Sequence, residues 1–544
     1  MAGVDAAMEP EPIDEAAVEA QASARGATLH DLAALAVEVE VRLLRGLLGL
    51  VKIIGLPDSA LRESRERVAA AIKASALHFP DRSLLINLAP AETRKVGPGL
   101  DLPIACAVLA ATDQLPRSAL AQPLLFGELA LDGRLRPVRG AVPVALLARR
   151  EGRTLLAPRA LLPELALVRS LAVVGVDSLE EVVRLLRGER PFVIAEPPPP
   201  PSEPATDTSF DSIVGQDEAK SAVAIAAAGG HHLLLTGPPG TGKSMLAKSL
   251  AALLPDLDEA TALEVSCIHS AAGLPPREAP LRPPMRSPHC SVTQVGLSGG
   301  GQVPRPGELT LAHRGVLFLD ELPQFRREAI ELLRAPLEDG RIVLARAGRS
   351  LAFPTRFLLV AAMNPCPCGN AGEPDGACSC SLAVIERHRA RLSGALLDRI
   401  DLSVRVPFVP AERRRPSRGT SRLAQVRARV AAVRARALAR NDGCLNAELP
   451  AARLLGIEAA LSPATQDWLA RMIDRLRLSL RAHHRLLRVA QTLADLADST
   501  AIELPHLAQA LACREPEHER DPGAAQFSVR AASRGAAPRT GATP

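Results

Sequence analysis

Apolar and polar positions follow two different patterns along the chain. Leu84–Leu88 and Leu171–Val176 are short apolar runs of strand length, whereas Leu61–Ala76 carries apolar residues at helical spacing. Further along, His232–Thr236 is another buried-strand pattern, and it leads through a glycine-rich loop into the helix-forming residues Met245–Leu254. Because strand and helix patterns alternate, the sequence predicts an α/β fold.

Past residue 410 the pattern becomes helical. Val426–Leu438 and Leu469–Leu496 have apolar residues three and four positions apart in a background rich in alanine and arginine. The proline-rich stretch Glu196–Pro204 cannot continue a helix or a central strand, so we expect a stiff spacer there. These changes predict a flexible N-terminus at 1–29, an α/β domain at 30–192, a linker at 193–208, a second α/β domain at 209–410, a helical domain at 411–514 and a disordered tail at 515–544.

Composition and charge limit the classes of function that the chain can have, but they do not identify one. A chain of 544 residues is long enough for several folded units. The formal charge of +5, from 65 basic and 60 acidic residues, is too balanced to establish a nucleic-acid partner. Aromatic residues make up 2% of the chain, with one Trp and no Tyr, so base stacking is disfavoured and contacts to a phosphate backbone fit better.

We expect a cytoplasmic protein with no membrane span. Met1–Thr28 lacks the basic start and the apolar core of a signal peptide. Leu32–Leu56, the most apolar early stretch, is interrupted by charged residues and cannot be an uninterrupted membrane helix. The nine cysteines are an odd number, which argues against a disulfide framework in a reducing compartment.

The glycine-rich loop after His232–Thr236 has the composition of a Walker A phosphate-binding loop. Backbone N–H groups of such a loop wrap phosphate oxygens at the positive N-terminus of the next helix. Lys243 would reach the β- and γ-phosphates of ATP, and the Ser244 hydroxyl would ligate Mg²⁺. The predicted nucleotide-binding residues are Gly237, Pro238, Pro239, Gly240, Thr241, Gly242, Lys243 and Ser244.

A second apolar strand ends in two adjacent carboxylates. Asp320 and Glu321 directly follow the apolar run Gly315–Leu319, and a carboxylate pair inside a core needs a function. Asp320 is placed to hold Mg²⁺ through its water shell, and Glu321 can polarise the water that attacks the γ-phosphate. The two motifs together predict an ATPase.

Through the Walker A loop and the carboxylate pair, the chain resembles the AAA+ ATPases. Among these, it resembles the magnesium-chelatase-like group that includes the YifB/ComM proteins. The resemblance covers most of residues 30–510 and implies a central AAA+ domain followed by a C-terminal helical lid. Its most specific motifs are Gly215-Gln216, Ala226–Gly230, Pro306–Glu308, Leu311–His313, Gly315–Pro323, Ala361–Gly369 and Leu396–Asp401.

This resemblance implies further roles for three residues. Asn364, at the end of an apolar strand, would be the sensor 1 residue that orients the attacking water. Arg399 would be an arginine finger that reaches the γ-phosphate of a neighbouring subunit, which implies a homo-oligomeric ring, expected to be a hexamer. Arg481 would be the sensor 2 arginine of the lid, or else one more arginine on a basic helix.

Residues 30–192 resemble the ChlI-type domain of the same group, which is distantly similar to the Lon protease domain and has a ribosomal S5 domain 2-like α/β fold. In a Lon-like peptidase a nucleophilic serine follows the turn that here is Lys95–Pro98, but this chain has Gly99. The expected lysine base near position 144 is Val144. Without the hydroxyl and the amine we expect no peptidase activity.

Four cysteines cluster beside Asn364. Cys366 and Cys368 lie on one side of a glycine-rich loop, and Cys378 and Cys380 on the other. Four thiolates can hold a structural Zn²⁺, although the Cys-x-Cys spacing is tighter than the common Cys-x-x-Cys. Reduced cysteines in a polar loop remain the alternative interpretation.

Arginines recur from Arg413 to Arg440 and from Arg471 to Arg488. They could form a surface that binds a phosphate backbone, or they could lie on helix faces exposed to solvent. The segment Glu338–Phe353 predicts a hairpin similar to the presensor hairpin of this AAA+ clade, with Arg346 and Arg349 as candidate DNA contacts.

The favoured hypothesis is a DNA translocase or branch-migration helicase that acts on single-stranded or branched DNA in recombination during natural transformation. A magnesium-chelatase motor subunit and a protein-remodelling AAA+ chaperone are the alternatives.

Overall fold

The structure is a computed structural model, and it describes residues 18–194, 209–277, 281–301, 304–346, 349–373, 378–410 and 422–514. The chain forms two compact units. The first unit comprises Met1–Ser202, Asp258–Pro280 and Gly300–Pro306, and the second comprises Glu203–Leu257, Leu281–Gly299 and Gly307–Pro544. Most of the predicted linker and the whole predicted tail at 515–544 lie outside the described residues.

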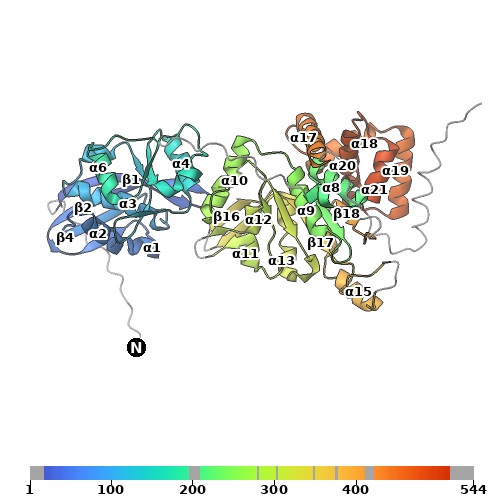
Figure 1. Cartoon of the computed structure of the whole chain (residues 1–544), viewed down its shortest axis with the longest axis horizontal. Coiled ribbons are helices and arrows are strands. Elements are labelled where there is room, and N and C mark those ends of the chain that lie inside the picture. Colours follow the sequence, from blue (N-terminus) through green and yellow to red (C-terminus); the bar gives the residue numbers. More distant parts are fainter. Residues whose placement is uncertain are drawn as a thin grey trace, which may run out of the picture. The chain divides into compact units, whose positions relative to one another are not determined.

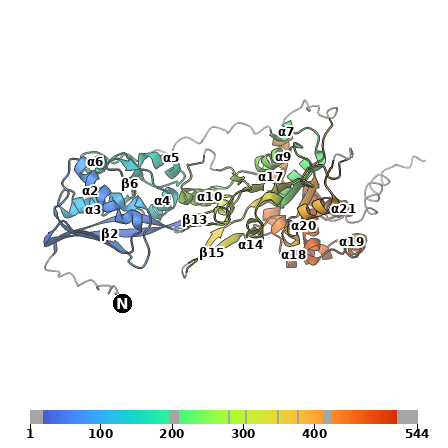
Figure 2. The same ribbon diagram turned by 90° about the horizontal axis from the view of Figure 1, so that it is seen from below.

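The first unit is built on a seven-stranded mixed sheet with the strand order β3-β4-β2-β1-β5-β8-β9. Its helices α2, α3, α4 and α6 lie on one face of the sheet, as Figure 2 shows. The elements of this unit are β1 (Val18–His30), β2 (Ala33–Leu48), β3 (Val51–Ile54), α1 (Ser59–Arg62), α2 (Ser64–Ala74), β4 (Arg82–Ala89), α3 (Asp101–Ala111), β5 (Leu124–Leu125), β6 (Glu128–Leu129), β7 (Leu135–Arg136), α4 (Ala141–Arg150), β8 (Leu155–Pro158), α5 (Leu162–Leu165), β9 (Val173–Val176), α6 (Leu179–Leu186) and α10 (Glu259–Ala272).

Two features of the first unit differ from the sequence prediction. Strand β1 begins at Val18, inside the segment expected to be a flexible N-terminus, because its backbone pairs with β2 along its whole length. Helix α10 lies inside the predicted 209–410 domain but packs on α4, where the Gly140 N–H donates to the Ser270 carbonyl at 2.9 Å. Both differences arise from contacts between segments that local composition does not reveal.

A buried ion pair anchors helix α3 in the first unit. All eleven residues of α3 are buried, as expected for a helix that is apolar on every side. At its start the Asp101 carboxylate accepts two hydrogen bonds from the Arg67 guanidinium, at 2.7 and 3.0 Å, and others from the Ser64 hydroxyl and the Leu129 N–H. Burial raises the pKa of Asp101, and the Arg67 guanidinium and Ser64 hydroxyl oppose that shift.

The second unit contains a five-stranded sheet with the order β11-β14-β17-β10-β18, and every strand pair in it is parallel. Its central strands are apolar on both faces because helices cover both sides. The strands and helices of this α/β part are α7 (Ser209–Ser212), α8 (Asp217–Gly229), β10 (Leu233–Thr236), α9 (Lys243–Leu253), β11 (Met285–Arg286), α11 (Gln294–Ser298), α12 (Glu308–Leu311), β14 (Val316–Leu319), α13 (Arg327–Glu331), α14 (Arg334–Asp339), β15 (Arg341–Arg346), β16 (Arg349–Pro354), β17 (Leu358–Met363), α15 (Leu382–Arg389), α16 (Gly394–Leu397) and β18 (Leu402–Arg405).

The C-terminal helices belong to the same compact unit as this sheet. Val433 of α17 and Leu486 of α20 share a buried core with Leu235 of β10 and Leu250 of α9. The predicted helical stretch Leu469–Leu496 is divided into two helices. The helices of this region, coloured orange to red in Figure 1, are α17 (Arg422–Arg440), α18 (Ala451–Ala459), α19 (Pro463–Leu476), α20 (Leu480–Leu496) and α21 (Leu504–Ala512).

Among the described residues, no helix combines the length and the apolar character needed to cross a membrane.

Replacing Asp101 with alanine should destabilise the first unit by about 3 kcal/mol, since it leaves the Arg67 guanidinium and several buried donors without their acceptor. Urea unfolding followed by circular dichroism measures this change. Glu180→Ala is the control, because that carboxylate is 55% exposed in a surface ion pair with Arg184 on helix α6 and its loss should change stability by less than about 0.5 kcal/mol. Equal unfolding midpoints for the two variants would contradict the structural role of Asp101.

Candidate nucleotide-binding site

The strand order of the second unit brings three separate motifs to one edge of the sheet. The Walker A loop follows β10, the Asp320-Glu321 pair follows β14, and Asn364 follows β17. Strand β17 lies between the other two and is parallel to both. Since the carboxyl ends of parallel strands meet at the same edge, Asn364 stands between the two Walker motifs.

The Walker A loop has the backbone that a phosphate cradle requires. Gly240 and Gly242 have φ angles of 75° and 93°, in the left-handed region that favours glycine. A Cβ at Gly237 would lie 2.1 Å from the Val406 carbonyl oxygen, so this position has no room for a side chain. The loop then enters α9 at Lys243, where the first N–H groups of a helix are free to bind an anion.

Lys243 is buried, with its ammonium group held by three oxygens. Its Nζ donates to the carbonyls of Gly237 at 2.8 Å and Pro238 at 2.7 Å, and to Oδ1 of Asn364 at 3.1 Å. Burial lowers the pKa of Lys243, while the carboxylates of Asp320 and Glu321 act in the opposite direction. The contact with Asn364 joins the Walker A lysine directly to the predicted sensor 1 residue.

Ser244 and Asp320, the two predicted Mg²⁺ residues, are in contact. The Ser244 hydroxyl donates to Oδ2 of Asp320 at 2.9 Å. This spacing lets one Mg²⁺ bind the Ser244 hydroxyl directly and contact the Asp320 carboxylate through its water shell. The residues present therefore fit Mg²⁺ together with the phosphates of a nucleotide.

Glu321 occupies an unusual backbone conformation next to this pair. Its φ angle is 51°, in the left-handed region that costs a non-glycine residue about 1 kcal/mol. Its N–H donates to Oδ1 of Asp320 at 2.9 Å, which fixes the turn, and its side chain is exposed. A strained position that presents a solvent-accessible carboxylate beside the Mg²⁺ residues suits a group that activates water.

Arg399 is paired inside its own chain. Its guanidinium forms an ion pair with Glu338 of α14 and donates to the Ala395 carbonyl at 2.7 Å, while its buried Nε has no hydrogen-bond partner among the residues that the structure describes. Arg481 lies 3.5 Å from the other oxygen of Glu338, and its side chain is 60% exposed. One carboxylate thus holds both arginines to which the resemblance assigns catalytic roles, a link that sequence reasoning did not find.

Arg485, one turn after Arg481, ties helix α20 to the segment that carries Arg399. Its buried guanidinium donates to the carbonyls of Ile400 at 2.7 Å and Leu397 at 3.3 Å. In the sequence, Arg485 is one of the recurring arginines between Arg471 and Arg488 and carries no signal of its own. Its burial depends on the tertiary contact with α16, and no local pattern predicts it.

The basic stripe of α17 is largely occupied by contacts within the chain. Arg434 donates to the Ala227 carbonyl at 2.7 Å, and burial lowers its pKa to about 10. Arg440 makes two hydrogen bonds to Asp495, at 2.6 and 2.8 Å, and Arg427 pairs with Asp256 at 2.8 Å. For these arginines the structure favours a structural role over a phosphate-binding surface, whereas Arg413–Arg418 lie outside the described residues.

The predicted hairpin is present. Strands β15 and β16 are antiparallel, with Ile342 opposite Phe353 and Arg346 opposite Arg349 at the turn. The side chains of Arg346 and Arg349 lie outside the described part of the structure. The backbone alone therefore places these two candidate DNA contacts, at the end of the hairpin.

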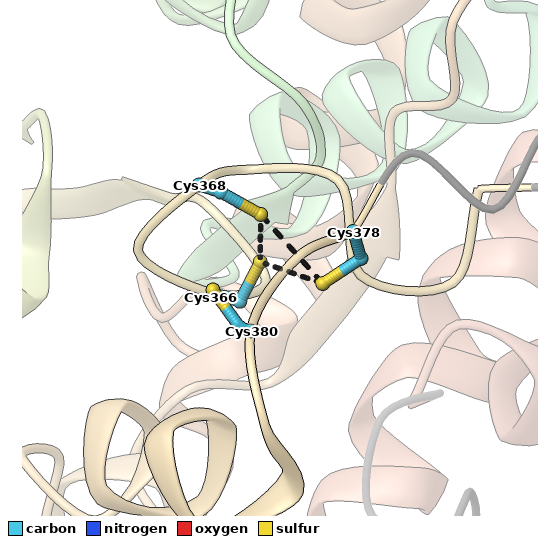
Figure 3. A group of neighbouring side chains, drawn as sticks. All are labelled: Cys366, Cys368, Cys378 and Cys380. Carbon is cyan, nitrogen blue, oxygen red and sulfur yellow. Dashed lines mark hydrogen bonds between the residues drawn. The ribbon is translucent and has the colours of Figure 1, made fainter.

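The four cysteines beside Asn364 converge, as Figure 3 shows. Their Sγ atoms all lie within 4.8 Å of one another. The separations are 3.3 Å between Cys366 and Cys368, 3.7 Å between Cys366 and Cys378, and 3.6 Å between Cys368 and Cys378. All are free thiols, and Cys366 is buried. Four cysteine sulfurs at such distances are a donor set that suits Zn²⁺.

The two peptidase positions of the first unit offer no catalytic groups. Gly99 packs so closely against Phe126 that a Cβ would lie 2.5 Å from the ring. Val144 is buried within α4. A serine at position 99 would need the ring to move, so this unit is built for packing at both positions.

A five-stranded parallel sheet with a Walker A loop, a carboxylate pair and a polar strand-end residue side by side defines the AAA+ class of P-loop ATPases. Models of known families agree with this class. The magnesium chelatase subunit ChlI model matches residues 209–414, the model for the ChlI subunit of Mg-chelatase matches 39–160, and the ChlI C-terminal model matches 420–514. The chain belongs to the magnesium-chelatase-like AAA+ family, in the group of the YifB and ComM proteins.

Several relatives match almost the whole chain. The competence protein ComM of Haemophilus influenzae is 40% identical over 490 residues, which cover 88% of this chain and 94% of ComM. The YifB protein of Escherichia coli is 40% identical over 496 residues, 89% of this chain and 96% of YifB. The magnesium-chelatase 38 kDa subunit of Cereibacter sphaeroides is 32% identical over 180 residues, 29% of this chain and 52% of that subunit.

Lys243→Ala should weaken ATP binding by about a hundredfold, because it removes the cation expected to face the phosphates. Lys248→Ala is the matched control, since Lys248 lies exposed on the same helix.

Glu321→Gln should bind ATP normally and lower kcat by about a hundredfold, as expected on loss of a general base. Binding of a fluorescent ATP analogue and phosphate release measure these effects, and an unchanged Kd for Lys243→Ala would refute the site.

Proposed function

We propose that the chain is an ATP-hydrolysing motor that works as a homo-oligomeric ring, with a hexamer as the expected form. The convergence of Lys243, Ser244, Asp320 and Asn364 at one sheet edge carries this proposal. ATP with Mg²⁺ would bind at the Walker A loop, Glu321 would activate the attacking water, and Asn364 would orient it. We include a structural Zn²⁺ at the four cysteines among the cofactors.

The ring requires Arg399 to act on the nucleotide of a neighbouring subunit. Its intramolecular partner Glu338 is half exposed, at 52%, so a phosphate with more negative charge can compete for the guanidinium. A cation supplied by the next subunit would stabilise the charge that develops on the transferred phosphoryl group. Hydrolysis would then depend on assembly.

A mixing experiment tests the shared site. Arg399→Ala should bind ATP but lose turnover by about a thousandfold. Lys243→Ala should also be inactive alone, yet its subunits still carry Arg399. In a mixed ring they would complete the intact Walker A sites of the Arg399→Ala subunits, so mixing should restore part of the turnover. Arg387→Ala, on the exposed face of α15, is the control and should hydrolyse ATP normally. Normal hydrolysis by Arg399→Ala, or no recovery on mixing, would refute the shared site.

We propose that DNA is the polymer on which the motor works, in recombination during natural transformation. The match to ComM, named a competence protein, supports this substrate because it covers nearly all of both chains. The hairpin that ends in Arg346 and Arg349 offers cations for a phosphate backbone. Arg471, Arg475 and Arg477, exposed in and just after α19, are further candidates.

The two alternatives have less support. A magnesium-chelatase motor role is favoured by the ChlI family models, but the magnesium-chelatase subunit of Cereibacter sphaeroides matches only 29% of this chain. A protein-remodelling chaperone would not need arginines at the hairpin end. The buried glycine and valine at positions 99 and 144 support a first unit that guides or braces the motor and does not cleave peptides.

Turnover of ATP should be stimulated by single-stranded or branched DNA, and not by unfolded protein or by porphyrin with Mg²⁺. Arg346→Ala/Arg349→Ala should bring the ratio of DNA-stimulated to DNA-free turnover close to one and reduce the salt dependence of DNA binding. Arg341→Ala, at the base of the same hairpin, is the control and should keep the stimulation. Failure of DNA to stimulate wild-type turnover at low salt would exclude the DNA substrate.

A further inference from the structure

Three of the four cysteine sulfurs are spaced as in a tetrahedral metal centre, and the fourth, that of Cys380, lies within 4.8 Å of each of them. A Zn²⁺ bound by four thiolates at about 2.3 Å separates its sulfur atoms by about 3.8 Å. The three measured separations, 3.3, 3.6 and 3.7 Å, are close to this value. They are much longer than the roughly 2.0 Å of a disulfide bond. Small side-chain movements would suffice to admit the ion.

The cysteine loop rests directly on the Walker A loop. The Gly369 N–H donates to the Cys366 carbonyl at 3.0 Å, so the first Cys-x-Cys pair lies within a tight turn. Gly369 has a φ angle of 88°, and a Cβ there would lie 2.5 Å from Cδ of Pro239. The turn that carries the first two sulfurs is therefore in van der Waals contact with the loop expected to hold the phosphates.

Both ends of the cysteine loop return to Asn364. At its start, Asn364 is separated from Cys366 by a single proline. After Cys380 the chain enters α15, where Nε2 of His388 lies 3.1 Å from the Asn364 carbonyl oxygen. Asn364 in turn accepts the hydrogen bond from the Lys243 ammonium. The sulfurs, the sensor residue and the Walker A lysine thus form one continuous set of contacts.

A third anchor joins the loop to the sheet. Arg405, the last residue of β18, pairs with Glu373 at 3.2 Å and donates to the Gly372 carbonyl. The described part of the loop is thus fixed to β18 and to the Walker A turn. A metal ion that closes a loop removes chain entropy and stabilises the closed geometry.

We propose that Cys366, Cys368, Cys378 and Cys380 bind one Zn²⁺ and that this ion positions Asn364 for ATP hydrolysis. Four thiolates fill the coordination sphere, so the metal activates no water itself. Its effect reaches the reaction through Asn364 and the Walker A turn, which makes it a positioning centre. This inference rests on the proposed ATPase function for its kinetic part, whereas metal binding stands without it.

Three variants of the full chain separate metal binding from the fold. Cys378→Ser should lose about one zinc per chain and lower kcat by about 10- to 100-fold, as expected when a supporting contact of a site is lost, with ATP affinity changed less than about threefold. Cys378→His keeps a Cys₃His donor set and should retain the metal and most of the turnover. Cys444→Ser, a half-buried cysteine of the lid region, should match the wild type in both.

Metal analysis and Co²⁺ substitution give readouts independent of turnover. The wild type should contain one zinc per chain, and its Co²⁺ form should show the absorption of a tetrahedral thiolate site, absent in Cys378→Ser. After chelation, Mg²⁺ alone should not restore turnover, whereas Mg²⁺ with Zn²⁺ should.

A wild type without zinc, or with the four thiols oxidised to disulfides, overturns the metal site. Zinc lost from Cys378→Ser at unchanged kcat overturns the positioning role. An inactive wild type that still binds zinc would instead refute the proposed ATPase function.

Discussion

The parallel register of β10, β17 and β14 is the constraint on which the site depends. Leu233 pairs with Val360, and Val316 with Leu358, so the strands end together at one edge. A shift of one residue would turn the side chains of a strand to the opposite face and separate the motifs. In the observed register the Lys243 ammonium reaches Asn364, and this hydrogen bond joins loops that lie 121 positions apart in the sequence. The sheet is buried on both faces, so its core fixes the register.

In the same unit, ion pairs and hydrogen bonds of buried arginines connect the C-terminal helices to the rest of the fold. Glu338 on the short helix α14 binds both Arg399 and Arg481, so release of one arginine changes the electrostatic environment of the other. Arg485 fastens α20 to the segment that carries Arg399, and Arg440 fastens α17 to α20 through Asp495. These bridges connect the helical region to the sheet that carries the Walker motifs.

The sequence predicted those features that depend on local pattern. The apolar runs before Gly237 and Asp320 are the strands β10 and β14, and the hairpin that spans Arg346 and Arg349 is present as β15 and β16. What it could not predict depends on distant partners. The pairing of Arg399 with Glu338 joins residues 61 positions apart, and the contact of α10 with α4 crosses an expected domain boundary. The arginines of α17 form a basic stripe in sequence, yet their carbonyl and carboxylate partners are visible only in the fold.

We propose that a second subunit completes the nucleotide site. The most direct test of this proposal is a structure of the assembled protein with Mg²⁺ and a non-hydrolysable ATP analogue. We predict that Lys243, Ser244 and Asp320 surround the phosphates and Mg²⁺ of one subunit, that Asn364 faces the γ-phosphate, and that Arg399 of the adjacent subunit has left Glu338 to reach that phosphate. An assembled ring with bound nucleotide in which every Arg399 remains paired with the Glu338 of its own chain would contradict the claim.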